Sequence, residues 1–308
     1  MSGLRIIDLN LAAQALLERR HGGMRCRELA AAAVPPDMVE FLEAGAFGMA
    51  MARDAVAAVE AGELVATDEG VQLVWREEDV ELAAPLLPRS LRELSAYEGH
   101  LRAVGMEPPP VWYDLPLYWK GNPHAVIGPD VDVVWPKYTS AMDFELEIAA
   151  VIGRVTRDAS PMEAAGAIAG FTIFNDVSAR DVQRRENEFL LGPSKGKDFC
   201  NVLGPVLVTS DEIDPDNLAV AVSVNGEVWA RGDTSGMQHR WGDVVSYLSQ
   251  DETLYPGDVI TSGTVTGCSA LEHYPGRDLA AGLIQSGDVV ELEVESIGIL
   301  RNRYLQSV

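Results

Sequence analysis

The chain has 308 residues, is 47% hydrophobic and carries a formal net charge of −23. Such an acidic chain argues against sequence-independent binding to nucleic acid or to an anionic membrane, since both need a basic surface. No uninterrupted apolar run reaches the roughly 18–20 residues that span a bilayer, and the N-terminus lacks the pattern of a secretory signal. The three cysteines are widely spaced and predict neither a zinc site nor a disulfide framework. We therefore expect a cytoplasmic protein.

Residues 1–85 are predicted to form a small mixed α/β region of their own. Helical periodicity is present in three stretches, which are 11–20, 26–33 and 35–62. A short strand pair is expected within 64–75, with its turn at 68–70. Pro85 and Pro88 mark the boundary with the rest of the chain. Nothing in this region indicates a function.

Residues 86–308 are predicted to form a second, mainly β domain, which makes the chain α+β overall. The domain begins with a predicted helix over 91–105, and further helices are expected from Ser178 onward and over 241–250. The expected strands are 131–135, 144–152, 168–174, 201–208, 217–223, 258–262, 288–295 and 298–302. We find no internal repeat and no phosphate-binding glycine loop.

The stretch MDFELEIAAVIG, residues 142–153, alternates acids with apolar residues. In a strand, alternate side chains share a face, so one face carries Phe144, Leu146 and Ile148 and the other carries Asp143, Glu145 and Glu147. A half-exposed strand would give the same alternation, but the apolar run 148–152 indicates that this strand is buried. Buried carboxylates repel one another. A divalent cation such as Mg²⁺, Mn²⁺ or Ca²⁺ would offset that repulsion.

Asp176 ends the predicted strand AIAGFTIFND, at the point where a helix is expected to begin. An acid in this position caps the helix or binds a metal, and the residue alone leaves both alternatives open. The polar residues that follow, including Arg180, Gln183 and Lys197, favour the ligand. The chain has twenty arginines but only four lysines, all within 120–197. That bias suggests that some of these positions need a compact ammonium group.

Four motifs follow one another in an order known from one family. DFELEIAAVIG is similar to a D-x-E-x-E metal strand, and FNDVSARDVQ to an N-D-x-S-A-R-D segment. GKDFCNVLGP is similar to a K-x-F…L-G-P loop, and LYPGDVITSGTVTG matches L-x-P-G-D-x-I-x-[ST]-G-T-x-x-G. Through these motifs residues 86–308 resemble the fumarylacetoacetate hydrolase family. The resemblance implies a β-roll or β-sandwich catalytic domain and a homodimer.

The resemblance also implies a metal site for Mg²⁺, or for Mn²⁺ or Ca²⁺. By their positions in the motifs, Glu145, Glu147 and Asp176 correspond to the family's ligands. A fourth ligand in the fumarylacetoacetate branch is an Asp that precedes the catalytic histidine by seven residues. The corresponding residue here is Glu93, and Ser95 replaces a family tyrosine. The chain departs from the pattern at both positions.

The remaining implied residues are catalytic or contact the substrate. They are the base His100 with Glu272 as its partner, the oxyanion-stabilising Arg180, Gln183 and Lys197, and the substrate contacts Lys120 and Thr264. His100 follows Glu93 by seven residues, about two helical turns, so a continuous helix would place both on one side.

These roles predict a metal-dependent hydrolase that cleaves a C–C bond in a β-diketo or acylpyruvate-type acid. His100 would activate water, the three polar residues would hold the oxyanion, and the ion would stabilise the leaving enolate. The same metal site also suits a 2-oxo acid decarboxylase, an isomerase or a dehydratase of 2-keto-3-deoxy sugar acids. An alternative of another class is a non-catalytic protein that binds a divalent cation structurally. We expect a small-molecule acid as substrate, with no nucleic-acid or membrane partner.

Overall fold

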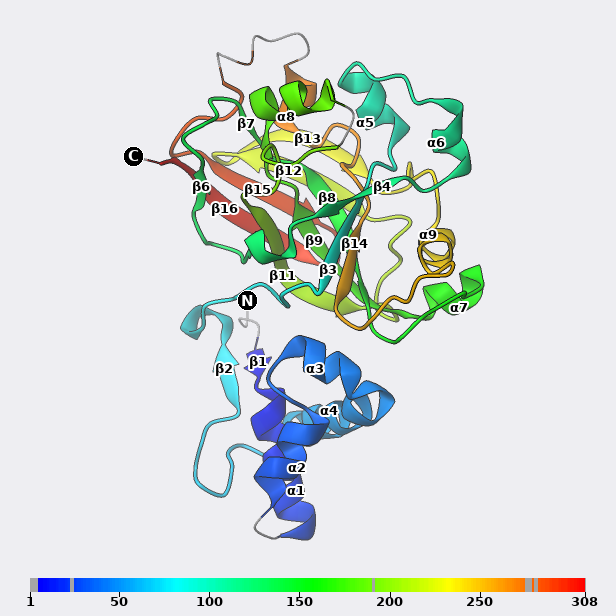
Figure 1. Ribbon diagram of the computed structural model, residues 1–308. Helices are drawn as coiled ribbons and strands as arrows, with labels where there is room; N and C mark the ends of the chain where they lie inside the picture. The colour runs from blue at the N-terminus through cyan, green and yellow to red at the C-terminus, as the bar shows by residue number, and fades with distance from the viewer. Residues whose placement is uncertain (1–4, 23–24, 190–191, 275–278, 280–281, 308) are drawn as a thin grey trace. The chain divides into compact units, whose positions relative to one another are not determined.

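The computed structural model describes residues 5–22, 25–189, 192–274, 279 and 282–307 (Figure 1). The chain divides into two compact units, Met1–Leu82 and Ala83–Val308. We call them the N-terminal and the C-terminal unit and describe each separately. Within the described residues, no helix has the length and apolarity that crossing a membrane requires.

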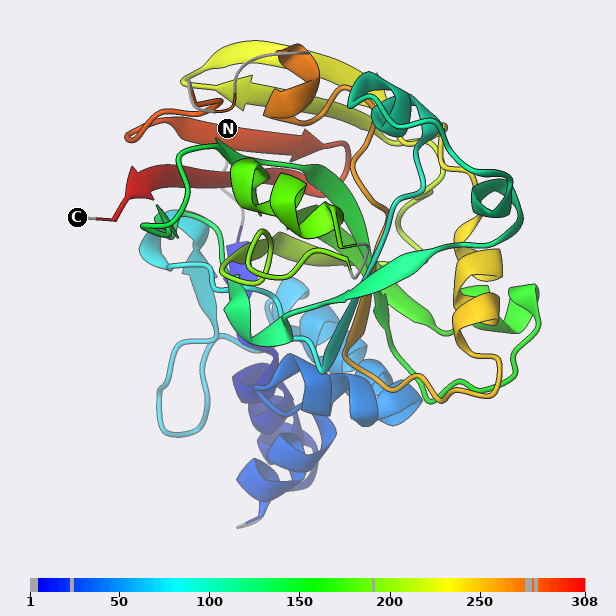
Figure 2. The same cartoon turned by 45° about the horizontal axis from the view of Figure 1, so that its top comes forward.

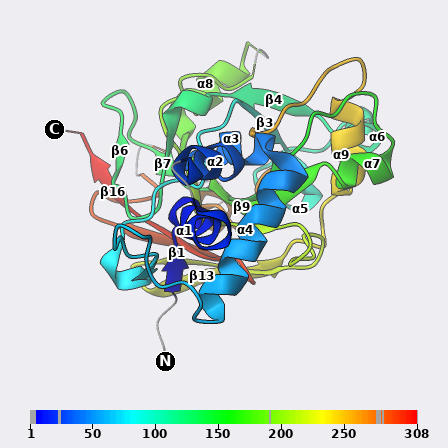
Figure 3. The same ribbon diagram turned by 90° about the horizontal axis from the view of Figure 1, so that it is seen from below.

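The N-terminal unit is a helical cluster with a short two-stranded sheet. Its elements are β1 (Arg5–Ile7), α1 (Leu9–His21), α2 (Cys26–Ala33), α3 (Met38–Glu43), α4 (Gly45–Glu60) and β2 (Val74–Arg76). Asp8 and Asp37 cap α1 and α3 by accepting hydrogen bonds from backbone N–H groups of the first turn. Helix α1 packs against α2 and α4 (Figure 3).

Two sequence predictions for this unit need correction. The stretch 35–62 forms two helices instead of one, because Gly45 has a φ of 59° and turns the chain between α3 and α4. The strand pair expected within 64–75 is reduced to a single bridge between Ala66 and Gln72. The strand β2 that follows pairs instead with β1.

The C-terminal unit contains two larger sheets. A seven-stranded sheet has the order β4-β3-β14-β8-β9-β11-β5, and a five-stranded sheet has the order β13-β12-β15-β16-β6. The bounds are β3 Ser90–Leu94, β4 Tyr118–Gly121, β5 Val126–Ile127, β6 Val133–Trp135, β8 Leu146–Ile152, β9 Ile168–Asn175, β11 Asn201–Thr209, β12 Ala219–Val224, β13 Glu227–Asp233, β14 Asp258–Thr261, β15 Val289–Val294 and β16 Gly298–Gln306. The predicted α+β, mainly β fold is confirmed.

Short helices and a two-stranded pairing surround these sheets (Figure 2). The pairing joins β7 (Met142–Asp143) to β10 (Ser178–Ala179). The helices are α5 Glu98–Ala103, α6 Pro110–Asp114, α7 Pro161–Ala165, α8 Arg180–Asn187, α9 Trp241–Leu248 and α10 Ala270–His273. The strands that the sequence did not predict in this unit are β3, β4, β5, β7, β10 and β13.

Every second side chain of strand β8 points into the core, and the others point to the opposite face of the sheet. All seven of its residues are buried, which confirms that the strand is not half-exposed. Leu146 and Ile148 belong to a core cluster that also contains Leu292 and Leu300 of the five-stranded sheet. Because side chains alternate along a strand, Glu147 points away from that core, to the opposite face of the sheet.

The predicted helix over 91–105 is wrong in its first half. Residues 90–94 form strand β3 between β4 and β14, and only Glu98–Ala103 is helical. The helical period was misleading because Leu91 and Leu94 are buried within the sheet, where tertiary packing outweighs local propensity. The buried Arg92 is stabilised there by hydrogen bonds to Glu252, at 2.5 Å, and Ser90.

Candidate metal and catalytic site

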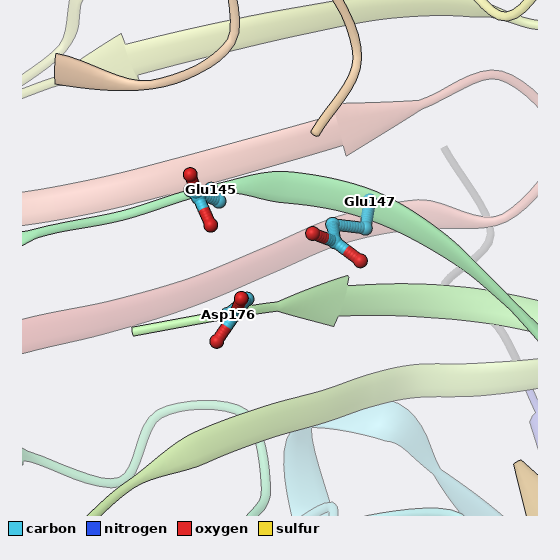
Figure 4. A group of neighbouring side chains, drawn as sticks. All are labelled: Glu145, Glu147 and Asp176. Carbon is cyan, nitrogen blue, oxygen red and sulfur yellow. The ribbon is translucent and has the colours of Figure 1, made fainter. Parts of the chain in front are cut away.

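Three buried carboxylates converge at the end of two antiparallel strands. Glu145 and Glu147 flank the first residue of β8, and Asp176 directly follows β9, whose Asn175 pairs with Leu146. Each carboxylate offers an oxygen within 4.8 Å of the others (Figure 4). An all-oxygen donor set suits Mg²⁺, Mn²⁺ or Ca²⁺. The residues present therefore fit a divalent ion, although their assignment as ligands remains a prediction.

Glu147 is held by the turn that follows β14. Its Oε2 accepts a hydrogen bond from the backbone N–H of Gly263, at 3.1 Å. Gly263 has a φ of 79°, and a Cβ there would lie 2.7 Å from the carbonyl oxygen of Leu94. Only glycine allows the turn to approach β3 so closely. The predicted substrate contact Thr264 follows directly and is buried beside the carboxylates.

Glu93, the predicted fourth ligand, lies on β3 beside this cluster. It is buried, and neither carboxylate oxygen has a hydrogen-bond partner among the described residues. Burial, together with repulsion from Asp176 and Glu147, raises its pKa well above the usual range. A side chain at Gly121 of β4 would collide with Glu93 Oε1. The structure thus makes room for Glu93 but does not include it in the three-residue cluster.

Two buried cations balance part of this negative charge. Lys197 Nζ contacts both Glu145 Oε2 and Asp176 Oδ2. Arg180 donates from Nη2 to Glu145 Oε1 at 2.6 Å and from Nη1 to Gln183 Oε1 at 2.9 Å. Burial would lower the pKa of both cations, but the facing carboxylates raise it above the usual value. Both side chains are therefore charged parts of the site.

Lys197 is placed by a close approach of its loop to helix α8. A Cβ on Gly196 would lie 2.9–3.0 Å from the backbone and Cβ atoms of Gln183. Glycine at 196 lets the loop lie directly against the helix, which directs the next residue toward the carboxylates. Helix α8 has Ala179 as its N-cap residue, and no side chain makes a capping hydrogen bond there. The capping alternative for Asp176 is therefore wrong.

The carboxylates differ in how they titrate. Burial opposes ionisation of Glu145, but Arg180 and Lys197 lower its pKa well below the usual range. Burial raises the pKa of Glu147 well above that range, and it raises the pKa of Asp176 to about 6 despite Lys197. The site therefore holds more carboxylates than its two cations can balance, and a divalent ion would balance the remainder.

This imbalance predicts a pH-dependent stabilisation by metal. The pKa values of Asp176 and Glu147 are higher in the folded chain than in the unfolded chain. Between about pH 5.5 and 7 the folded chain therefore binds more protons than the unfolded chain. Stability of the chelator-treated protein should therefore fall as pH rises through this window. Glu145 has a lowered pKa and is already ionised throughout this pH window. We expect Mn²⁺ to raise the midpoint of thermal unfolding more at about pH 7.5 than at about pH 5.5. An equal rise at both pH values would contradict the imbalance.

His100 lies between two carboxylates at the edge of the cluster. Its Nε2 is 3.6 Å from Glu145 Oε1, and its Nδ1 is 3.3 Å from Glu272 Oε2. Burial would raise the pKa of Glu272, but His100 and nearby backbone N–H groups lower it. Glu272 is fixed by hydrogen bonds from Gly267 and Ser269 at the start of α10. The structure thus brings together the predicted base and its predicted partner.

The helix that carries His100 packs on the loop that leads to Glu272. A Cβ on Gly99 of α5 would lie 2.6 Å from the side chain of Thr266. Glycine at this position lets α5 lie directly against the loop before α10. Glu93 and His100 reach one site although no continuous helix joins them, because strand β3 leads directly into α5.

Asp143 is a site residue to which the sequence analysis gave no role. Its Oδ2 accepts from Arg180 Nε at 2.7 Å, and its Oδ1 accepts from the backbone N–H of Ala270 at 2.7 Å. It therefore joins the oxyanion candidate Arg180 to the first turn of α10, which carries Glu272. The alternating pattern did place Asp143 on the same face as Glu145, and this was the available signal.

A pocket of about 680 Å³ opens over these groups. The predicted residues that line it are His100, Glu145, Glu147, Asp176, Arg180, Gln183, Lys197 and Thr264. Its apolar lining includes Leu101, Val104 and Met106. Lys120 is exposed and does not line the pocket, whereas its neighbour Trp119 does. Trp119 pairs with Glu93 across β3 and β4, so alternation turns Lys120 to the opposite face.

The fold and this site define a class of α+β enzymes with an oxygen-lined site for a divalent ion. The family model described as "Fumarylacetoacetate (FAA) hydrolase C-terminal" matches residues 91–304. The chain belongs to the fumarylacetoacetate hydrolase family, which confirms the resemblance of its motifs. Members of this family include hydrolases, isomerases and tautomerases.

Among curated proteins, the chain is similar to human "Oxaloacetate tautomerase FAHD2A, mitochondrial". The two are 33% identical over 274 residues, which cover 88% of this chain and 80% of that protein. Among solved structures it is similar to 5-carboxymethyl-2-hydroxymuconate delta-isomerase from Mycobacterium smegmatis, with 35% identity, a TM-score of 0.62 and coverage of 76% of this chain and 86% of that chain. Fumarylpyruvate hydrolase from Pseudomonas aeruginosa, in complex with Mn²⁺ and pyruvate, is 25% identical with a TM-score of 0.61, over 71% of this chain and 91% of that chain.

Proposed function

We propose that the protein is a divalent-metal-dependent tautomerase that interconverts the enol and keto forms of a 2-oxo acid. The observation that carries this choice of reaction is that Arg180 and Lys197 are both engaged with carboxylates, and His100 supplies the base. Its Nε2 lies at the edge of the carboxylate cluster, and its Nδ1 faces Glu272. This arrangement suits a base that moves one proton over a short distance.

Glu145, Glu147 and Asp176 would hold the ion, which would polarise the 2-oxo group and make the adjacent carbon more acidic. His100 Nε2 takes the proton from the carbon next to the oxo group. The same proton is then returned to the substrate oxygen, which gives the enol, and the reverse sequence gives the keto form. Glu272 orients the ring and stabilises the imidazolium that forms while the proton is held. No water is consumed and no C–C bond breaks.

The hydrogen bonds of Arg180 favour proton transfer over cleavage. Its Nε and Nη2 donate to Asp143 and Glu145, and its Nη1 donates to Gln183. Lys197 is likewise engaged with Glu145 and Asp176. Cations held in this way support the carboxylates, whereas an oxyanion hole needs donors aimed at the reacting oxygen. The similarity to an oxaloacetate tautomerase and to an isomerase agrees with this choice.

The C–C hydrolase predicted from sequence is the second candidate. The His100–Glu272 pair would serve equally well to activate water, and one structural relative is a fumarylpyruvate hydrolase. In that case Arg180, Gln183 or Lys197 would turn toward the adduct when substrate binds. The homodimer and the cytoplasmic location stay predictions, and the human relative is named as mitochondrial.

The two candidates are separated by following two reactions with the Mn²⁺-loaded protein. Decay of the near-ultraviolet absorbance of enol oxaloacetate reports tautomerisation, and loss of an acylpyruvate chromophore with release of the acid reports hydrolysis. We expect enol decay well above the rate without protein, with no release of carbon dioxide, and little cleavage. Cleavage without enol decay would favour the hydrolase, and released carbon dioxide would indicate a decarboxylase. If neither assay shows metal-dependent turnover, the remaining interpretation is that the metal site is structural.

A further inference from the structure

One face of helix α8 forms a wall of the pocket. The residues of this helix that line it are Arg180, Gln183, Arg184 and Asn187. Their spacing is that of residues on one side of a helix. Arg180 is buried at the inner end of this wall, whereas Arg184 and Asn187 are exposed at its outer end. The helix therefore extends from the carboxylate cluster to the mouth of the pocket.

Arg184 differs from the other cations that line the pocket. Arg180 and Lys197 are bonded to Asp143, Glu145 or Asp176, and His100 faces Glu145 and Glu272. The side chain of Arg184 makes no hydrogen bond or ion pair with any residue that the structure describes. Its guanidinium is thus available to a ligand, and a guanidinium matches a carboxylate through two parallel hydrogen bonds.

We propose that Arg184 binds the second carboxylate of the substrate, so that the enzyme acts on dicarboxylic 2-oxo acids. This inference rests on the proposed function, because it assumes that the 2-oxo acid end of the substrate lies at Glu145, Glu147 and Asp176. Arg184 is one helical turn, about 5.4 Å, further out along α8 than Arg180. A four-carbon diacid with its 2-oxo end at the cluster would extend its distal carboxylate in this direction.

The rest of the outer pocket supports a single anchoring contact. Apart from His100, the lining contributed by α5 and the segment after it is apolar, with Leu101, Val104 and Met106. These side chains can cover the carbon chain of a substrate but cannot pair with a charge. Near the mouth, a free carboxylate would therefore gain most from Arg184. An uncharged end group of the same size would gain much less, because its hydrogen bond to Arg184 would lack the acceptor's charge.

The test compares oxaloacetate with its 4-methyl ester, which keeps the 2-oxo acid end and removes the distal charge. The variants are Arg184→Gln and Arg184→Lys, with Arg185→Gln as the matched control. Arg185 is the adjacent arginine of the same helix, is also exposed and does not line the pocket. Steady-state constants for enol decay and calorimetric binding of both compounds to the Mn²⁺-loaded protein are measured for each variant.

We expect Arg184→Gln to raise KM for oxaloacetate roughly 10-fold or more, the usual effect of losing a charge-assisted hydrogen-bonded pair. Constants for the ester and kcat should change little, Arg184→Lys should recover part of the loss, and Arg185→Gln should resemble wild type. An equal effect on both compounds, or no effect on either, would overturn the inference while the proposed reaction stands. If wild type turns over neither compound, the proposed reaction fails, and the binding data alone decide whether Arg184 selects the diacid.

Discussion

The Glu147→Gln variant should lose roughly 10³-fold in kcat for enol decay, because metal polarisation of the substrate is worth several kcal/mol in the transition state. Glu147 is the most suitable of the three carboxylates for this test. Glu145 also holds Arg180 and Lys197, so its substitution disturbs two further groups. Glu147 accepts a hydrogen bond from Gly263, which the amide oxygen of glutamine can still accept. The fold should therefore be kept while one charged ligand is lost.

The measurement is a Mn²⁺ titration of the chelator-treated protein, with calorimetry for affinity and enol decay for turnover. Glu293→Gln is the matched control, because Glu293 is an exposed residue of β15 outside the pocket. The control should bind Mn²⁺ and turn over substrate like wild type. If Glu147→Gln bound Mn²⁺ with unchanged affinity, Glu147 would not be a ligand.

Replacing His100 by Asn should lower kcat by roughly 10²–10⁴-fold, the usual contribution of a general base. Affinity for Mn²⁺ should barely change, because His100 is not among the three clustered carboxylates. The effect is expected for acylpyruvate cleavage as well, should that occur, since the base serves both reactions. Enol decay and Mn²⁺ affinity are measured side by side.

His124→Asn is the matched control for this substitution. His124 is exposed and does not line the pocket, so its loss should leave kcat unchanged. A decrease of only a few-fold in the His100 variant would reject His100 as the base. In that case the ion alone would carry the reaction.

The carboxylate cluster could be predicted because its signal is local. Glu145 and Glu147 share a strand face through alternation, and Asp176 ends the adjacent strand of the same sheet. Glu272 could be assigned only weakly, because it lies 172 residues from His100 and the two meet through the packing of α5 on the loop before α10. No periodic pattern in the local sequence predicts such a contact.

The errors have equally physical causes. Residues 91–105 have helical spacing, but pairing with β4 and β14 makes the first of them a strand. The pairing of β4 with β3 also sets which side chains of β4 face the pocket. Trp119 faces it, and Lys120 points away from it. Asp143 was left without a role because its partners Arg180 and Ala270 are distant in sequence. Side chains that act through tertiary contacts therefore needed the structure.

The most direct test of this account is the anomalous diffraction of a crystal that contains Mn²⁺ and oxalate, an unreactive analogue of a 2-oxo acid. We expect one strong peak about 2.0–2.6 Å from carboxylate oxygens of Glu145, Glu147 and Asp176, the range for divalent ions with oxygen ligands. Oxalate should complete the coordination from the pocket side, with His100 Nε2 facing it. A peak elsewhere, or one that lacks any of the three carboxylates, would contradict the account.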